Sequence, residues 1–479
     1  MLGAEPPRDS AVRARLATGV STDSRTVARG DCFFAIAGEH FDGHDYVGRA
    51  LAGGAVCAVV SRDADEVGSV LRVADTIEAL GRLAREYRRM NGFKIVAITG
   101  SVGKTTTRQI VHHVLSRRFR ARQARKNFNN TIGLPLTLLD AEPADEVLVT
   151  ELGANHPGEI AYLTRIAEPD VAVVTNAHPA HLEGFGDLAT IIREKTAIAE
   201  GLADDGILIA NGDIKPLVEA ARAKGKPLRT FGRLADADCR AEGVASTGLG
   251  SAFAIQGKRI HLPLPGPGNV DNALAAWAVC DRFGITLDEF ATALADLSGV
   301  AMRAELMQIG HLTVLNDCYN ANPASMANAL AILRGLRAPS DSGGRRRLVF
   351  ICGEMAELGP QTEALHAELG QAVARAGVDL LLAVGAPTQV TARAAEASDA
   401  AQVHRACFED TAALCEDLDR FIEEDDIILV KGSRTARLER VVKRLRERYG
   451  GPNAPLPVEE ALPPKGRYQM ERITDREKG

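Results

Sequence analysis

Short apolar runs that alternate with helical stretches dominate the middle of the chain. Between residues 93 and 299, four runs have the composition of strands buried on both faces: Ile95–Ile98, Val147–Thr150, Val171–Val174 and Gly206–Ala210. Near-continuous apolar strands separated by helices are typical of a parallel sheet that helices cover on both sides. The sequence therefore predicts an α/β fold built on a central, doubly wound, mostly parallel sheet.

Similar alternation before and after this region predicts three domains, since 479 residues exceed what one hydrophobic core of roughly 150 residues can organise. We expect a small N-terminal α/β domain over residues 1–92, a central domain over 93–299, a Rossmann-like C-terminal α/β domain over 300–450 and a flexible tail over 451–479. The segment Ala252–Leu264 contains two short strands around Gln256-Gly257 and predicts an antiparallel appendage to the central domain. Strands are expected in the outer domains at Cys32–Ile36, Ala55–Val60, Leu348–Cys352, Leu380–Val384 and Ile427–Val430.

The bulk composition excludes several classes of protein. With 46% hydrophobic and 25% charged residues the chain is an ordinary globular one, and a net charge of -6 argues against a nucleic-acid partner. The eight cysteines are scattered and form no C-x-x-C pair, which favours a reducing compartment. Residues 1–7 lack the features of a signal peptide, and no apolar run approaches the roughly 18 residues that span a bilayer. We expect a cytoplasmic protein without membrane insertion.

The loop after the first central strand is rich in glycine and leads into a helix. It reads Thr99-Gly100-Ser101-Val102-Gly103-Lys104-Thr105-Thr106. In such a loop the backbone N–H groups and the start of the helix can hold phosphate oxygens, the lysine neutralises charge and a threonine hydroxyl can bind Mg²⁺. The sequence predicts a phosphate-binding loop, and the alternative is an incidental glycine-rich turn.

This loop is shorter at its start than the common pattern G-x-x-x-x-G-K-[ST], which would require glycine where the chain has Ile98. A nucleotide-driven switch or motor, the main alternative from another functional class, would carry the full pattern. A GTPase would also carry an N-K-x-D motif, which is missing. These differences weigh against a switch.

Three later residues are candidates for the chemistry at the same edge of the sheet. Glu151 follows a central strand, where ligands of open α/β sheets bind, and is a candidate for holding Mg²⁺. His181 lies in the polar loop after the next strand, and Lys195 lies in the helical stretch Leu188–Leu202. Taken alone, each has an ordinary alternative: an end-of-strand carboxylate, a surface histidine and a solvated lysine.

Taken in order, these segments resemble the Mur ligase family, whose members build the peptide of bacterial cell-wall precursors and use the short loop T-G-[ST]-x-G-K-[ST]. The resemblance covers about Ser21 to Val442 and rests on Thr99–Thr105, Lys126–Pro135, Glu151–Gly153, Asn176–Leu182, Lys195 and Gly266–Ala276. Two segments depart from the family pattern. Gly268 replaces the histidine of G-x-H-N, and the K-G-E-I segment reads Lys195-Thr196-Ala197-Ile198.

Other segments indicate which reaction the resemblance implies. Ser21–Arg25 and Phe41–His44 resemble the uridine-nucleotide-binding start of the later-acting members. Asp317–Pro323 and Gly353–Gly359 resemble the enzyme that adds D-alanyl-D-alanine, and the D-N-P-R motif of the ligase for the third amino acid is missing. A folate polyglutamylating enzyme would lack the uridine-binding start. The expected activity is ATP-dependent joining of D-alanyl-D-alanine to UDP-N-acetylmuramoyl-tripeptide through an acyl phosphate, by a monomer.

The resemblance also implies a role for each site residue. Lys104 would contact the ATP phosphates, Thr105 and Glu151 would hold one Mg²⁺, and His181 with a carbamylated Lys195 would hold a second. The expected ATP-binding residues are Thr99, Gly100, Ser101, Val102, Gly103, Lys104, Thr105, Thr106, Asn272, Arg303 and Asp317. The expected substrate-binding residues are Ser24, Arg25, Asp42, His44, Asn130, Thr131, Tyr319, Asn320, Asn322, Lys431 and Ser433. Whether the acceptor carries diaminopimelate or lysine is left open.

Overall fold

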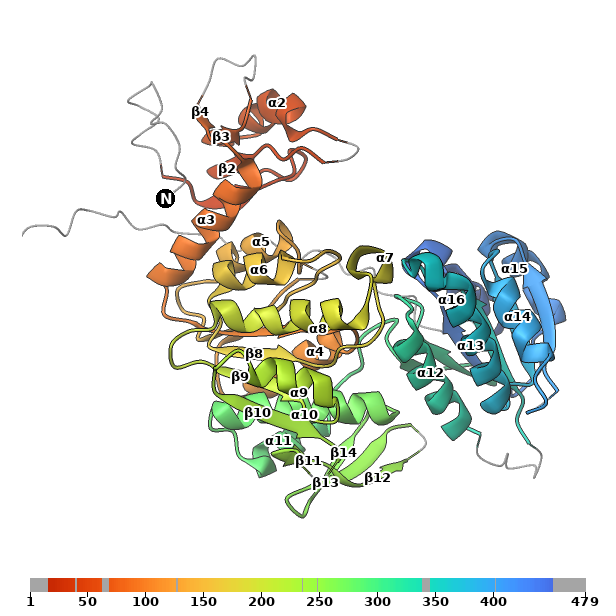
Figure 1. The fold of residues 1–479 in the computed structure, drawn as a ribbon. Coiled ribbons are helices and arrows are strands. Elements are labelled where there is room, and N and C mark those ends of the chain that lie inside the picture. The colour runs from red at the N-terminus through yellow and green to blue at the C-terminus, as the bar shows by residue number, and fades with distance from the viewer. Residues whose placement is uncertain are drawn as a thin grey trace, which may run out of the picture.

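A computed structural model describes residues 16–38, 41–62, 69–125, 128–234, 236–247, 249–337, 345–400 and 402–450. The expected tail at 451–479 lies outside these residues, as do Lys126 and Asn127 of the family-like segment Lys126–Pro135. Figure 1 shows a small N-terminal part above a central part, with the C-terminal part beside the latter.

The N-terminal part is a parallel four-stranded sheet in the order β1-β2-β3-β4. Its elements are β1 (Gly19–Ser21), β2 (Asp31–Phe34), η1 (Gly43–Tyr46), α2 (Val47–Ala52), β3 (Cys57–Val60) and β4 (Val70–Arg72). Helix α3 (Thr76–Met90) follows, capped by Asp75, whose carboxylate accepts from the amides of Ile77 and Glu78. This helix packs against α5 and α6 of the central part, so it joins the two parts.

The central part is a seven-stranded parallel sheet in the order β11-β10-β9-β8-β5-β7-β6. Its strands are β5 (Lys94–Thr99), β6 (Ala121–Gln123), β7 (Val147–Glu151), β8 (Val171–Val174), β9 (Ile207–Asn211), β10 (Leu228–Gly232) and β11 (Cys239–Arg240). Its helices are α4 (Lys104–Leu115), α5 (Gly133–Leu139), α6 (Glu159–Ala167), α7 (Leu182–Phe185), α8 (Leu188–Thr196), η2 (Ala197–Gly201), α9 (Lys215–Arg222), α10 (Pro267–Arg282) and α11 (Leu287–Leu294).

Side chains of β5 alternate between two apolar clusters on the two faces of this sheet. Val96 and Ile98 pack with α4, α10 and α11, whereas Ile95 and Ala97 pack in the cluster that includes α5, α6 and α8. Because both faces are buried, the strand is apolar throughout, which explains why its run was recognisable in the sequence. The doubly wound central sheet is confirmed.

The antiparallel appendage has three strands among the described residues: β12 (Glu242–Ser246), β13 (Ser251–Ile255) and β14 (Lys258–Leu262). The sequence predicted only the last two. All five residues of β12 are exposed, so this edge strand lacks the alternation that marks a half-buried strand. The stretch predicted as one helix over Leu188–Leu202 is instead α8 followed by the 3₁₀ turn η2.

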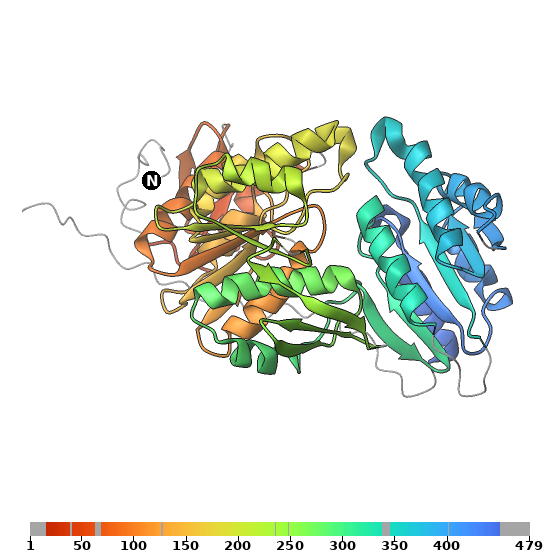
Figure 2. The same cartoon turned by 60° about the horizontal axis from the view of Figure 1, so that its bottom comes forward.

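The C-terminal part is a six-stranded sheet in the order β15-β16-β20-β17-β18-β19, parallel except for the pair β15 and β16. Its strands are β15 (Glu305–Ile309), β16 (Leu312–Asn316), β17 (Leu348–Gly353), β18 (Leu380–Val384), β19 (His404–Phe408) and β20 (Ile427–Lys431). Its helical segments are α12 (Pro323–Gly335), η3 (Gly359–Gln361), α13 (Thr362–Arg375), α14 (Thr388–Glu396), α15 (Thr411–Asp417), η4 (Leu418–Arg420), η5 (Arg434–Ala436) and α16 (Glu439–Tyr449). In the turned view of Figure 2 this part again stands beside the central one.

Candidate active site

The predicted phosphate-binding loop connects β5 to α4, as the sequence indicated. Gly103 is the N-cap of α4, and Lys104 to Thr106 form the first turn of that helix. Because the first amides of a helix have no partner within it, this turn presents N–H groups and positive potential to an anion. The ammonium of Lys104 donates to the carbonyl of Gly100 at 2.6 Å, which folds the side chain back over the loop.

Two glycines of the loop are required by close contacts. Gly100 and Gly103 have φ of 147° and 85°, in the region that favours glycine. A Cβ on Gly100 would lie 2.0 Å from Oγ1 of Thr175, and one on Gly103 would lie 2.1 Å from Oδ1 of Asn272. The predicted adenine-contacting Asn272 therefore lies directly against the phosphate loop, on the buried face of α10.

The segment after β8 holds the phosphate loop in place. Asn176 Oδ1 accepts from the amide of Val102 at 2.9 Å, and its Nδ2 donates to the Val102 carbonyl at 3.0 Å. Ser101 Oγ donates to the carbonyl of His178 at 2.8 Å and accepts from the His178 amide at 3.0 Å. Thr99, at the end of β5, donates through Oγ1 to the Leu152 carbonyl at 2.8 Å. These hydrogen bonds tie the phosphate loop to the neighbouring strands and loops.

Glu151 lies at the end of β7, paired in register with Ile98. Its carboxylate is buried and faces the guanidinium of Arg108 on α4, with Nη1 and Oε1 3.1 Å apart. Oε1 accepts no hydrogen bond of regular geometry, so the contact is an ion pair in which the oxygen retains capacity for another cation. Arg108 was not predicted, although its position one turn after Lys104 could have suggested that it faces the same edge.

Lys104 interacts electrostatically with this carboxylate, and two further basic side chains, Lys195 and His181, interact with Lys104. Burial lowers the pKa of Lys104 to about 8, partly opposed by Glu151. Burial, with the charge of Lys104, lowers the pKa of Lys195 to about 7, and the Lys195 ammonium lies 5.5 Å from the ring centroid of Phe185. Burial also lowers the pKa of His181, opposed by Glu357 and reinforced by Lys104 and Lys195. The structure therefore places these three predicted residues in one electrostatic neighbourhood.

Among the described residues, no three His, Cys, Asp or Glu side chains converge as a preformed metal site. The donor set nevertheless suits Mg²⁺, because the buried Oε1 of Glu151 and the hydroxyl of Thr105 in the first turn of α4 are hard oxygen donors.

The C-terminal part contributes Arg303, Asp317 and Tyr319 to the same neighbourhood. The guanidinium of Arg303 stacks 4.2 Å from the ring centroid of Tyr319 and acts electrostatically on Lys104. Asp317 accepts from the amide of Ala304 at 3.0 Å and from Nζ of Lys431 at 2.7 Å. Lys431 is 1% exposed, and it also donates to the carbonyl of Asn320 at 3.0 Å, so here it supports the loop after β16.

Asn322 and Ser433, two more predicted substrate-binding residues, form hydrogen bonds within the protein. Asn322 caps α12 by accepting from the Ser325 amide at 2.9 Å, and its Nδ2 reaches the carbonyl of Ser101 at 3.5 Å, across the two parts. Ser433 accepts from the Ala356 amide at 2.8 Å.

In the N-terminal part, Asp42 and His44 brace the turn before α2. Asp42 accepts from the amide and Nδ1 of His44, and these bonds lower the pKa of its carboxyl to about 2. His44 is buried, and its Nε2 accepts from the Ser61 amide at 2.9 Å. Arg25 is exposed and pairs with Asp23, and Ser24 lies between them in the turn. In Figure 1, α2, which follows the turn at Asp42 and His44, lies in the N-terminal part, and α4, which begins at the phosphate loop, lies in the central part.

Asn130 and Thr131 lie at the start of α5. Asn130 Oδ1 accepts from the Gly133 amide at 2.8 Å. Thr131 lines a cavity of about 440 Å³. The other lining residues come from the starts of α3 and α6: Asp75, Ile77, Glu78, Pro157, Gly158, Glu159 and Tyr162.

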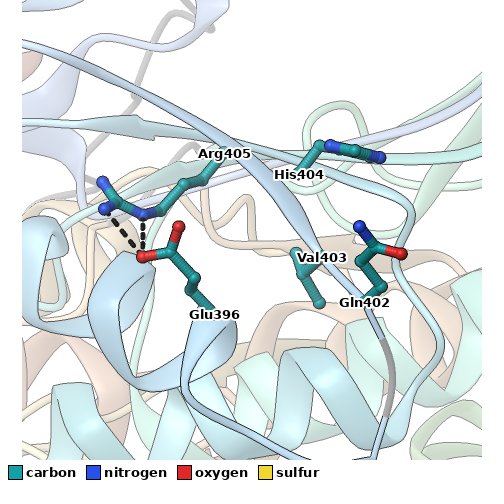
Figure 3. A pocket seen from close by; sticks show the side chains of 5 residues that line it. All are labelled: Glu396, Gln402, Val403, His404 and Arg405. Carbon is teal, nitrogen blue, oxygen red and sulfur yellow. Dashed lines mark hydrogen bonds and ion pairs between the residues drawn. The ribbon is translucent and has the colours of Figure 1, made fainter.

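A second cavity of about 590 Å³ lies at the outer edge of the C-terminal sheet, beside β19 (Figure 3). It is lined by Glu396, Gln402, Val403, His404 and Arg405. Glu396 and Arg405 are paired with each other at 2.7 Å, and none of the predicted site residues lines this space. Its size therefore does not mark it as the reaction centre.

Comparison with known proteins places this geometry in a family. Residues 17–88 match the model described as Mur ligase family, catalytic domain; residues 98–280 match the Mur ligase middle domain; and residues 302–434 match the Mur ligase glutamate ligase domain. The chain belongs to the Mur ligase family. The resemblance inferred from the motifs is thus confirmed.

Individual relatives narrow the relationship. The chain is 38% identical over 437 residues to the UDP-N-acetylmuramoyl-tripeptide–D-alanyl-D-alanine ligase of Escherichia coli strain K12, covering 89% of this chain and 93% of that protein. It resembles the crystal structure of MurF from Acinetobacter baumannii with a TM-score of 0.82 at 31% identity, covering 90% of this chain and 93% of that one. It also resembles MurF from Thermotoga maritima in complex with ADP, with a TM-score of 0.80 at 26% identity and coverage of 91% and 98%.

The described helices include none that is both long and apolar enough to cross a membrane.

Proposed function

We propose that this chain is an ATP-dependent, ADP-forming ligase that joins D-alanyl-D-alanine to UDP-N-acetylmuramoyl-tripeptide and yields the pentapeptide precursor of peptidoglycan. The full-length relationship to ligases of that name supports the reaction. The observation that carries the chemistry is the placement of Lys104, Glu151, His181 and Lys195 around one phosphate loop. We further propose that the protein acts as a monomer in the cytoplasm.

The chemical difficulty is that a carboxylate and an amine do not condense unaided in water. In the proposed reaction the acceptor carboxylate attacks the γ-phosphorus of ATP, the bond to the bridging oxygen breaks, and ADP leaves. The amine of the dipeptide then attacks the acyl phosphate, losing a proton and expelling inorganic phosphate. The first step brings two anions together, so positioning and cancelled charge dominate its barrier.

This chain supplies positive charge for that step from two directions. Lys104 and the first turn of α4 approach from the central part, and Arg303 from the C-terminal part. Bound Mg²⁺, held by Thr105 and Glu151 and by His181 with Lys195, would neutralise phosphate oxygens. We assign Asn272 and Asp317 to the nucleoside, and Ser24, Arg25, Asp42 and His44 to the uridine end of the acceptor. Asn130, Thr131, Tyr319, Asn320, Asn322, Lys431 and Ser433 are the proposed contacts of the peptide or phosphoryl groups.

The lowered pKa of Lys195, to about 7, supports its carbamylation. A neutral amine adds CO₂, loses a proton and becomes a carbamate anion with two hard oxygens. The carbamate anion would be attracted by the Lys104 ammonium, whereas a protonated Lys195 would be repelled by it. We therefore expect Lys195→Ala to lose activity that bicarbonate or short carboxylic acids partly restore; full activity of this variant without additives contradicts the proposal.

The reaction is tested by incubating the protein with ATP, Mg²⁺, D-alanyl-D-alanine and an acceptor carrying either diaminopimelate or lysine. We expect dipeptide-dependent phosphate release and a product heavier by the dipeptide less one water, with at least one acceptor. Lys104→Met is the matched control, since it removes the ammonium but keeps an unbranched side chain. If neither acceptor gives dipeptide-dependent phosphate, the proposed function is wrong.

A further inference from the structure

The loop that links β17 to η3 in the C-terminal part reaches across to the histidine of the candidate site. Oε2 of Glu357 is in hydrogen-bond contact with Nδ1 of His181. Beside it, the amide of Glu183 donates to the carbonyl of Glu357 at 3.1 Å. A side-chain contact and a backbone contact therefore join the same two segments, which lie 176 residues apart at the His181 and Glu357 positions.

Backbone conformation at both ends of this contact is unusual. His181 and Glu357 have φ of 52° and 62°, in the left-handed region, which is unfavourable for a residue with a side chain. Such conformations persist only where the surroundings impose them, and they concentrate at functional sites. Gly359 lies beside Glu183: a Cβ placed on Gly359 would be in ordinary van der Waals contact with the Glu183 Cα, at 3.5 Å.

The C-terminal part holds the loop rigid from behind. The Ser433 amide donates to the carbonyl of Glu354, and the Ser433 hydroxyl accepts from the Ala356 amide, both at 2.8 Å. Thr435 donates to the Glu354 carboxylate at 2.8 Å. These hydrogen bonds hold the loop that carries Glu357, although the contact between Glu357 and His181 is partly exposed.

We infer that Glu357 is a positioning residue that fixes the orientation and tautomer of His181 from the neighbouring domain. With Nδ1–H donated to Glu357, the lone pair of the neutral ring is on Nε2, which is then the nitrogen available to a cation. A histidine that binds a metal commonly donates its other ring N–H to a carboxylate in this way, and loss of the carboxylate lowers metal affinity about 10- to 100-fold. The inference rests on the proposed cation-binding role of His181.

The position of Glu357 gives this contact a consequence beyond orientation. Since the carboxylate belongs to the C-terminal part, His181 is oriented only while that part is docked on the central one. Coupling between two equilibria is reciprocal, so a cation on His181 would in turn stabilise docking. Cation binding at His181 and docking of the two parts are therefore coupled, each favouring the other.

The first test needs no metal. Protein labelled with ¹⁵N-histidine is examined by long-range ¹H–¹⁵N correlation, with the His181 signals assigned by their loss in His181→Asn. We expect the Nδ1–H tautomer in the wild type and a mixture or the other tautomer in Glu357→Ala, with Glu357→Gln intermediate because its amide oxygen still accepts. Glu363→Ala, an exposed carboxylate six residues further along the same part, is the control. An unchanged His181 spectrum in Glu357→Ala overturns the inference.

The second test uses Mn²⁺ as the probe, in the presence of ADP, with free Mn²⁺ followed by electron paramagnetic resonance. Glu357→Ala is expected to weaken the His181-dependent binding step about 10- to 100-fold, and Glu363→Ala to leave it unchanged. If His181→Ala weakens Mn²⁺ binding but Glu357→Ala does not, the positioning role is wrong while the cation role stands. If His181→Ala has no effect, the proposed cation role itself fails.

Discussion

At the scale of single residues, Gly103 combines a left-handed backbone with a contact that leaves no room for a side chain. Its φ is 85°, and a Cβ would lie 2.1 Å from the Asn272 oxygen. Gly103→Ala should therefore displace Asn272 or the loop and reduce ADP affinity at least about 10-fold, which corresponds to about 1.4 kcal/mol. Isothermal titration with ADP measures the change.

Gly225→Ala is the control that tests the effect of backbone strain without a steric contact. Its φ is 66°, but a Cβ there would meet nothing within 4 Å. Gly225→Ala should lower stability slightly and leave ADP affinity as in the wild type. Equal ADP affinity in the Gly103→Ala variant would show that the contact with Asn272 does not shape the nucleotide site.

The buried amine of Lys195 should make stability depend on pH. Its pKa is about 7 in the folded protein against 10.5 for an ordinary lysine, so between these values the unfolded chain holds the extra proton. The free energy of unfolding should therefore rise with pH from about 7 towards 10, relative to Lys195→Met, by at most about 1.4 kcal/mol per pH unit.

Urea unfolding in CO₂-free buffer, followed by the fluorescence of Trp277, measures this effect. Trp277 is the single tryptophan and is buried on α10, so it reports on the central part. The exposed Lys215→Met variant is the control. A stability difference between wild type and Lys195→Met that does not vary with pH contradicts the lowered pKa.

Sequence reasoning found the chemically distinctive residues of the candidate site but not their partners. Gly100, Lys104 and Thr105 are readable because the loop needs glycine, a cation and a hydroxyl at fixed spacing. Arg108 was missed, although its place one turn after Lys104 was a weak signal, and Glu357 was given no role although it lies in the family-like segment Gly353–Gly359. Their roles arise from tertiary contacts with Glu151 and His181.

At the scale of elements, the start of α10 is capped by a residue of another domain. The Gly268 amide, in the first helical turn, has no partner within the helix and donates to Oδ1 of Asn328 on α12 at 3.0 Å. Asn328→Ala should leave this amide unpaired, accelerate its hydrogen exchange and lower stability by about 1 kcal/mol. Exchange followed by mass spectrometry or NMR gives the local effect.

Asn328→Asp keeps an oxygen acceptor and adds a negative charge near a helix N-terminus, where it is favourable. It should protect Gly268 at least as well as the wild type. If Asp and Ala variants exchange equally fast, the carboxamide oxygen is not the cap. The same contact explains why glycine stands at position 268, where the family pattern has histidine. A Cβ on Gly268 would lie only 2.8 Å from Asn328 Oδ1.

The elements predicted best were strands buried on both faces, such as β5, β8 and β18. Edge strands were harder. The pair β15 and β16 was missed although β16 is fully buried, because β15 is only partly buried and carries polar residues such as Gln308. The sequence pattern alone indicated that the carboxyl ends of the parallel strands share one edge, but it did not predict the strand order, which places β8, β5 and β7 next to one another.

At the scale of the whole molecule, polar contacts join the central and C-terminal parts around the phosphate loop. They include His181 with Glu357, Ser101 with Asn322 and Gly268 with Asn328. Domain interfaces with few strong contacts usually permit relative motion. A nucleotide touched by both parts would therefore shift the molecule towards the docked arrangement, in proportion to its difference in affinity for the two states.

Arg303 is the residue through which this shift should be strongest, because it is a cation of the C-terminal part that acts on Lys104 of the central part. Without nucleotide, the two cations repel each other and oppose docking. In the proposed site the phosphates of ATP would lie between the two cations, and the interaction across the interface would become attractive. We expect a non-hydrolysable ATP analogue with Mg²⁺ to reduce the radius of gyration in small-angle X-ray scattering, and Arg303→Ala to abolish most of that reduction.

The same variant should bind the ATP analogue about 10-fold more weakly, since a hydrogen bond to a charged group contributes about 1.5–3 kcal/mol. Arg375→Ala, which removes an exposed arginine at the end of α13, should compact like the wild type. Because ligand-free Arg303→Ala loses the repulsion with Lys104, its radius of gyration without nucleotide should not exceed that of the wild type. Full compaction of Arg303→Ala by the analogue would mean that the nucleotide draws the two parts together through other residues.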